Sequence, residues 1–210
     1  MKIYNQLLVL LMLSPFAFSE MKPSMAQTSS FLAKELENNY TDARGDLCDP
    51  DYVKSDITTD VDVQYGILSI DKSCYSDAGM VYFGARIPLS KVTHISLGQS
   101  ELTETEVFSL SFMVDRNCRS FPREAISCIT STRSYMVNQD FESGEPIEPY
   151  RDTSEEPDTY IALYLQNYSE ENLKASKRIF NALKRYAELN DWEIEFKDET
   201  YQQVNGSMFD

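Results

Sequence analysis

The chain has 210 residues, the length of a single domain, and carries 34 Asp and Glu residues against 19 Lys and Arg residues, a formal net charge of −15 at pH 7. A negative field of this size repels nucleic acid and anionic membrane surfaces and attracts cationic molecules. The composition therefore excludes a nucleic-acid-binding protein and predicts a cationic partner.

The first residues have the pattern of a secretory signal peptide. Lys2 precedes an apolar run from Leu7 to Leu13, and the small residues Ala17 and Ser19 precede the expected cut. Residues 1–19 are the predicted signal peptide, with an alternative cut after residue 26. The run is too short to span a membrane, so we predict export without membrane insertion. The bacterial periplasm is favoured over a eukaryotic secretory route, in which the Asn-x-Ser/Thr tripeptides would accept glycans.

Four segments are expected along the chain. After the signal peptide, residues 20–59 hold a short helix from Ser29 to Tyr40, with Ser29 as its N-cap, and then an acidic loop. Residues 60–197 form a single β-rich domain with a C-terminal helix, and residues 198–210 form a loose tail.

Alternating apolar residues predict the first strands of the β-rich domain. A strand is expected from Val61 to Asp71, with Gly66 at a bulge. A second strand covers residues 80–87, where every other side chain is apolar, and a third runs from Val92 to Leu97.

The four cysteines predict disulfides, because their number is even and the chain is exported. Strand parity predicts a long hairpin from Val107 to Val137 that places Cys118 opposite Cys128. Cys48 would then pair with Cys74. The absence of a C-x-x-C spacing argues against a redox-active pair.

An unusually acidic segment runs from Asp140 to Asp158 and contains three prolines. We predict a long loop, either a disordered linker or a binding element. Its large apolar residues favour binding, and tyrosines on the outward parity of the following strand extend the surface. The predicted partner-binding residues are Phe141, Glu142, Glu145, Ile147, Glu148, Tyr150, Asp152, Glu155, Glu156, Tyr160 and Tyr164.

The C-terminal region reads as a strand, a helix and a short closing strand. The strand covers residues 159–168, and Ser169 is the expected N-cap of an amphipathic helix. The basic face of this helix is either solvated or paired with acids of the same chain. Residues 192–196 alternate as a closing strand.

These elements predict an α+β fold that is mainly antiparallel β: a curved sheet or partly open barrel of six or seven strands, with a short N-terminal helix and a C-terminal amphipathic helix. The segment IPLSKVTHISLG (Ile87–Gly98), the long hairpin and the strand that runs into LKASKRIFNALKRYAEL resemble a pleckstrin-homology or GRAM-type barrel, over about Val61 to Leu189. The resemblance implies a curved sheet capped by the last helix. It does not imply lipid binding, because the basic loop that holds phosphoinositides is missing.

Motifs for catalysis, metal or cofactor binding are not found. The sequence has no G-x-S-x-G, P-loop or dinucleotide-binding glycine pattern. The single histidine, His94, is expected to face away from the apolar side of its strand. Asp60, Asp62, Gln64 and Asp71 only approximate a calcium loop, so no metal or cofactor is predicted.

We therefore predict a non-catalytic exported protein that masks a cationic protein partner. Its sharpest form is an immunity protein that plugs the active site of an envelope-directed toxin. The alternatives are an envelope hydrolase that uses dispersed carboxylates, and a carrier of a small ligand. The sequence leaves the partner and the oligomeric state open.

Overall fold

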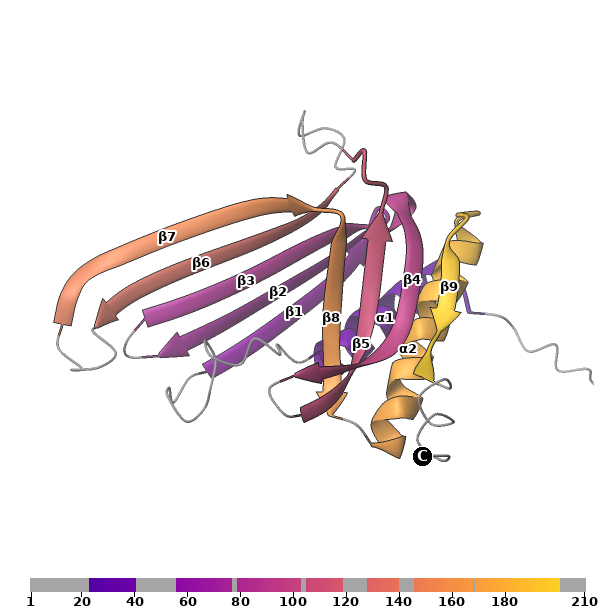
Figure 1. Cartoon of the computed structure of the whole chain (residues 1–210), viewed down its shortest axis with the longest axis horizontal. Coiled ribbons are helices and arrows are strands. Elements are labelled where there is room, and N and C mark those ends of the chain that lie inside the picture. The colour runs from indigo at the N-terminus through magenta and orange to yellow at the C-terminus, as the bar shows by residue number, and fades with distance from the viewer. Residues whose placement is uncertain are drawn as a thin grey trace, which may run out of the picture.

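Figure 1 shows a computed structural model of the chain, which describes residues 23–40, 56–76, 79–102, 105–118, 128–139, 146–167 and 169–200. The elements in chain order are α1 (Met25–Asn39), β1 (Asp56–Gln64), β2 (Ile67–Ser76), β3 (Gly79–Pro88), the 3₁₀ turn η2 (Leu89–Lys91), β4 (Val92–Leu102), β5 (Thr105–Val114), β6 (Ile129–Gln139), β7 (Pro146–Asp158), β8 (Tyr160–Asn167), α2 (Glu170–Leu189) and β9 (Glu195–Asp198).

The described strands form two sheets. A five-stranded sheet has the order β1-β2-β3-β6-β7 and a four-stranded sheet has the order β8-β5-β4-β9. All neighbours are antiparallel except β4 and β9, which are parallel. The predicted α+β, mainly antiparallel class is therefore confirmed. The single curved sheet or partly open barrel of six or seven strands was wrong, because the described strands divide between two sheets and neither closes.

The hydrophobic core lies where the two sheets and the two helices meet. Phe108 and Phe112 of β5 are fully buried there, together with Leu32 and Leu36 of α1. Complete burial of each such side chain stabilises the fold by about 1.5–3 kcal/mol.

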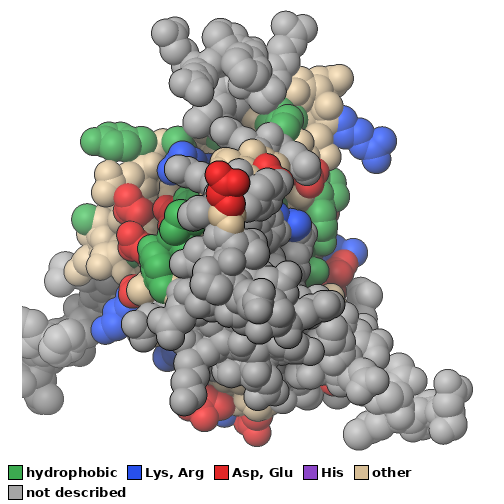
Figure 2. Space-filling model, turned by 90° about the vertical axis from the view of Figure 1, so that its left-hand side faces the viewer, with side chains coloured by type: hydrophobic (Ala, Val, Ile, Leu, Met, Phe, Trp, Pro, Cys, Tyr) green, Lys and Arg blue, Asp and Glu red, His purple; other side chains and the backbone are tan. Residues whose placement is uncertain are grey.

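The five-stranded sheet extends well beyond this core, toward the left of Figure 1, and Figure 2 views the molecule from that end. We call this part the projecting half of the sheet, and the register defines it as residues 56–60, 71–76, 79–84, 132–139 and 146–155. No described residue of the projecting half belongs to the core cluster.

The N-terminal helix begins earlier than predicted. Ser24, not Ser29, is the N-cap of α1: its hydroxyl accepts a hydrogen bond from the backbone N–H of Gln27, whose side chain bonds the N–H of Ser24 in return. This capping box satisfies two free donors of the first turn. The hydroxyl of Ser29 instead bonds the carbonyl of Ala26, as a serine inside a helix does.

The C-terminal helix agrees with the prediction. The Ser169 hydroxyl accepts a hydrogen bond from the N–H of Asn172, 3.1 Å away, and the predicted apolar stripe is buried along α2. The strands expected at residues 80–87, 92–97 and 159–168 are β3, β4 and β8, and the closing strand is β9.

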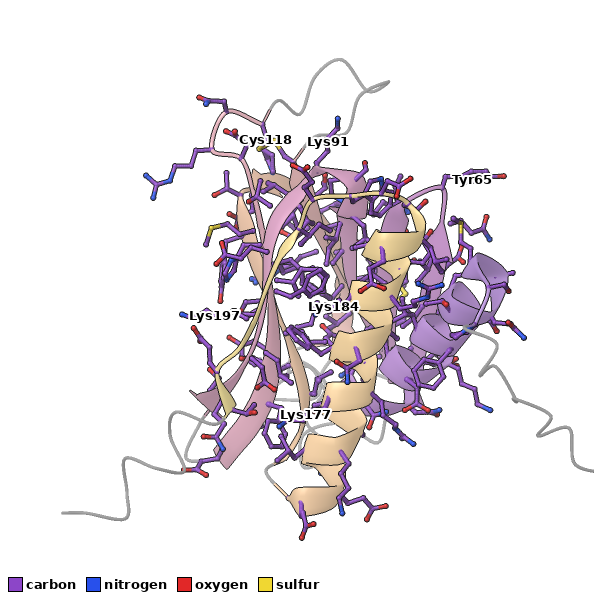
Figure 3. All side chains as sticks on the ribbon, turned by 90° about the vertical axis from the view of Figure 1, so that its right-hand side faces the viewer. Tyr65, Lys91, Cys118, Lys177, Lys184 and Lys197 are labelled. Atoms are coloured by element: carbon purple, nitrogen blue, oxygen red, sulfur yellow. A yellow bond between two sulfur atoms is a disulfide. The ribbon has the colours of Figure 1, made fainter. Side chains whose placement is uncertain are left out.

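Most of the basic face of α2 is paired with acids of the same chain. The ion pairs are Lys174–Glu170, Lys177–Asp198, Arg178–Glu35 and Arg185–Glu188. Arg178 reaches Glu35 of α1, and Lys177, labelled on α2 in Figure 3, reaches Asp198 at the end of β9. The pairing alternative is therefore confirmed for these four residues. Each exposed ion pair adds at most about 1 kcal/mol to the stability of the fold. Because four of its cations already have acidic partners, this face is a poor docking surface.

The predicted first strand is two strands. Gln64 pairs with Ile67, and the two residues between them, Tyr65 and Gly66, have φ values of 52° and 76°. Positive φ at both positions is the conformation of a tight hairpin turn. Gly66 is therefore a turn residue and not a bulge.

The disulfide was predicted correctly, but the hairpin that motivated it is wrong. Cys118 and Cys128 are bonded, with Cα atoms 5.0 Å apart. However, β5 belongs to the four-stranded sheet and β6 to the five-stranded sheet. The bond thus closes the crossover between two sheets. Cys74 is buried and disulfide-bonded, and Cys48, its expected partner, lies outside the described residues.

The acidic segment is a strand over most of its length. β7 pairs with β6 from Pro146 to Asp158, with an irregular register between Val137 and Gln139. β7 is the edge of its sheet, and an edge strand tolerates proline because one side of its backbone needs no partner. The predicted long loop was therefore wrong over residues 146–158.

Several predictions concern residues outside the described ranges. They include the signal peptide, Phe141, Glu142, Glu145, Tyr168 and residues 201–210. Among the described helices, none is both long and apolar enough to cross a membrane.

Candidate binding surfaces

The outer face of the projecting half carries a row of apolar side chains, two of them exposed and one half-buried. Tyr75 pairs in register with Met80, which pairs with Met136 on the next strand, so the three share one face of β2, β3 and β6. Tyr75 is 47% exposed and Met136 is 42% exposed. The core residue Ile70 has the opposite parity in β2, so this row faces away from the core.

Carboxylates lie on the same face as the apolar row, farther along the strands toward the core. Asp60 of β1 is directly opposite Asp71 of β2, and Asp62 follows two positions along β1. Two like charges in directly facing positions destabilise a sheet. We refer to Asp60, Asp62, Asp71, Tyr75, Met80, Tyr82 and Met136 as the outer-face patch.

A hydrogen bond joins the acidic and aromatic parts of this patch. The Tyr82 hydroxyl donates to a carboxylate oxygen of Asp71. Tyr82 lies over Gly84, where an added Cβ would be 2.5 Å from the Tyr82 hydroxyl oxygen. Partial burial, the bond to Asp71 and the charge of Asp71 raise the pKa of Tyr82 to about 12. Because residue 84 is a glycine without a Cβ, the Tyr82 side chain has space to lie over it.

Figure 2 shows acidic side chains next to hydrophobic ones along one flank of the molecule, seen from the projecting end. Apolar area rimmed by charge is typical of protein–protein interaction surfaces.

The residues predicted to bind a partner do not form one surface. Glu148 and Asp152 are exposed on β7. Asp152 pairs with Tyr135 and Glu155 with Thr132, so their positions lie on opposite faces of the strand. Tyr150 and Glu156 share the parity of Asp152, while Ile147 lies in the segment with irregular register. Strand formation thus divides the predicted set between two faces.

Tyr160 and Tyr164 both line a cavity between the two sheets. The cavity has a volume of about 140 Å³. Its lining residues come from the end of α1, from β3, β6 and β8, and from the corner between β7 and β8: Tyr40, Phe83, Ile129, Ser131, Asp158, Tyr160, Ile161, Ala162 and Tyr164. We call it the inter-sheet cavity.

Hydrogen bonds hold two of the lining side chains. Asp158 accepts from the backbone N–H groups of Thr159 and Tyr160, at 2.6 and 3.1 Å. The hydroxyls of Tyr160 and Ser111 are 2.9 Å apart. Next to the cavity, Lys72 is 8% exposed and its Nζ lies 5.7 Å from the ring centroid of Tyr40.

His94 lies on the outer side of the four-stranded sheet, as its parity predicted, between the buried positions of β4. Its Nδ1 is 3.4 Å from a carboxylate oxygen of Glu195 on β9, so it links two strands. Among the described residues, no group of three or more His, Cys, Asp and Glu side chains could hold a metal ion.

Comparison with protein-family models, with curated proteins and with solved structures finds no match to this chain. The resemblance to a pleckstrin-homology or GRAM-type barrel therefore stays a prediction.

Sequence reasoning missed the apolar row and the aromatic neighbours of the cavity. Tyr75, Met80 and Met136 belong to three strands, and only their register brings them together. Tyr40 and Phe83 reach the cavity from distant parts of the chain. A clue was available in the hairpin of β2 and β3, whose short connection makes Tyr75 and Met80 neighbours.

Proposed function

We propose that this chain is an exported, non-catalytic binding protein that masks a cationic protein partner, in its sharpest form an immunity protein against an envelope-directed toxin. The observation that carries the proposal is the outer-face patch. It places exposed Tyr75 and Met136 on the same sheet face as the carboxylates of Asp60 and Asp62, which lie four and six positions along β1 from Asp56, the register partner of Tyr75.

The physical argument has two parts. The negative net charge attracts a cationic partner over a distance of about one Debye length, which raises the rate of encounter. The apolar row then supplies area that loses water on contact, while the carboxylates pair with basic side chains of the partner at the rim.

Two features of the edge strand β7, its prolines and its charges, support recognition by the sheet face and not by this edge. β7 carries Pro146, Pro149 and Pro157, which lack the N–H groups that an added strand would need. Prolines and charges on an edge strand also oppose pairing with a further strand.

The test begins with capture of proteins from an envelope extract of the producing cells at low salt, followed by association rates with the purified partner. The double variant Asp60→Asn/Asp62→Asn is expected to slow association by about 3–10-fold at low salt, because charge pairs act mainly on the association rate. The control Glu171→Gln/Glu193→Gln removes the same charge at exposed positions away from the patch. Equal rates for the two double variants, or retention of only acidic proteins, would overturn the proposal.

The inter-sheet cavity favours a second candidate, a carrier of a small ligand. Its lining contains a single carboxylate, Asp158, so the paired carboxylates of a glycoside hydrolase are not found among its described residues.

A further inference from the structure

We infer that the inter-sheet cavity binds an organic cation with an apolar stem, of the kind that an arginine or lysine side chain supplies. This inference rests on the proposed function, because a cationic protein partner would present such a side chain. It assigns to the cavity a site that is separate from the outer-face patch.

Aromatic rings dominate the wall of the cavity. Tyr40, Phe83, Tyr160 and Tyr164 all line it, from the end of α1, from β3 and from β8. The face of an aromatic ring attracts a cation within about 6 Å of the ring centroid, and several rings around one space form a cage for organic cations.

The chain already uses one of these rings in this way. The ammonium of Lys72 lies 5.7 Å from the centroid of Tyr40. Because Lys72 would repel a second cation nearby, the charged end of the ligand is assigned to the part of the cavity near Asp158 and Tyr160.

The register separates these two parts. On the core-facing side of β6, Ile129 lies opposite Asp158, and Ser131 follows. Phe83 of β3 lies between Lys72 of β2 and Arg133 of β6, with which it pairs on either side. Arg133 is the next position after Ser131 on the same face of β6. Four residues of strand are about 13 Å long, so Asp158 and Phe83 lie at opposite ends of the lining, and we place the charged end of the ligand near Asp158 and its stem toward Phe83.

Asp158 is held in place for this role. Two backbone N–H groups fix one oxygen of its carboxylate, and the side chain is exposed at the corner between β7 and β8. The apolar side chains of Ile129 and Ile161 supply contacts for an alkyl stem. A volume of about 140 Å³ is large enough for one side chain but too small for a drug-sized ligand, whose pockets measure roughly 300–1,000 Å³.

The direct test titrates the full exported protein with arginine methyl ester and lysine methyl ester, followed by NMR of the aromatic side chains. Dissociation constants of about 1–10 mM are expected for one side chain alone. Citrulline methyl ester has a similar shape and the same α-amino group as the arginine ester, but its side chain is uncharged. It is expected to bind at least about threefold more weakly, since its side chain lacks the charge that the rings and Asp158 attract. Equal binding of the citrulline ester would overturn the inference.

Variants locate the site. Tyr164→Leu is expected to weaken binding of the arginine ester about two- to fivefold, while Tyr164→Phe keeps the ring and the affinity. Asp158→Asn keeps an oxygen that can accept both N–H bonds but removes the charge, and is expected to weaken binding by a similar factor. Tyr65→Leu changes a tyrosine that is 97% exposed in the turn between β1 and β2, outside the cavity and the outer-face patch, and is expected to leave ester binding unchanged. Thermal melting of each variant checks that it folds, and an unchanged affinity in folded Tyr164→Leu would refute the inference.

The source of the cation is decided with the purified partner. If Tyr164→Leu weakens partner binding, the ligand is a side chain of that protein; if it weakens only ester binding, the ligand is a free small cation. Failure of every ester to bind, while Asp60→Asn/Asp62→Asn still slows partner association, would end this inference and leave the proposed function standing.

Discussion

The two halves of the five-stranded sheet differ although the same strands run through both. Near the helices, β2 contributes Leu68 and Ile70, which are fully buried in the core. Farther along, the same strand carries Lys72 and Tyr75, and no described residue of the projecting half joins the core cluster. Since burial of apolar area is the main source of stability, the core half should hold the fold while the projecting half is free to serve recognition.

The contrast should be largest for aromatic residues. Phe112→Ala removes a fully buried ring and is expected to lower the free energy of unfolding by about 3–5 kcal/mol. Tyr75→Ala, on the exposed outer face, is expected to change it by no more than about 0.5 kcal/mol. Urea unfolding followed by far-UV circular dichroism measures both. A large loss for Tyr75→Ala would mean that the projecting half contributes to the core after all.

The crossover between the sheets depends on the disulfide. Cys118 and Cys128 are 10 positions apart, and a closed loop of this size stabilises a protein by about 3 kcal/mol through the entropy of the unfolded chain. The double variant Cys118→Ser/Cys128→Ser should lose that amount in urea unfolding without reductant. A loss below about 1 kcal/mol would show that packing of the neighbouring Ile129 already holds the crossover.

Two glycines, one in the projecting half and one in the four-stranded sheet, should respond to alanine with opposite signs. At Gly84, a Cβ would displace the Tyr82 hydroxyl and break its bond to Asp71, so we expect Gly84→Ala to destabilise the protein by about 1 kcal/mol. At Gly98 of β4, a Cβ would meet only Glu199, at an ordinary 3.6 Å. Gly98→Ala is expected to stabilise by about 0.5–1 kcal/mol, because alanine has less backbone freedom to lose. Thermal unfolding of both variants checks the pair, and equal signs would contradict it.

The smallest effect concerns pH. The pKa of Tyr82 is raised from 10.0 to about 12, so between these values the folded protein keeps a proton that the unfolded chain has lost. The stabilising effect is complete below pH 10 and is lost as the pH rises through 12. Stability of the wild type should therefore fall more steeply over this window than that of Tyr82→Phe. Parallel curves of urea midpoint against pH would disprove the assignment.

Local features of the fold were predictable because they depend on neighbours in the chain. Alternation identified β3, β4 and β8, helical spacing identified the buried face of α2, and Ser169 marked its start. Even the bond between Cys118 and Cys128 followed, since a ten-residue connection brings its ends close in a hairpin and in a crossover alike.

Features that depend on distant partners were not predictable. Prolines and carboxylates made β7 read as a loop, but the strand lies at a sheet edge, where missing N–H groups and exposed acids are tolerated. The candidate sites fared similarly. Tyr160 and Tyr164 were identified from parity, but Tyr40 and Phe83, the other aromatic residues that line the inter-sheet cavity, were not.

The amino-acid sequence by itself determined the acidic character, the α+β class, the positions of most strands and the disulfide between Cys118 and Cys128. Only the tertiary structure decided that the strands divide into two sheets, that β5 and β6 do not pair, and which tyrosines are exposed together. The reason is that side-chain periodicity reports which face of an element is buried, whereas the choice of neighbouring strand depends on long-range packing that alternation leaves open.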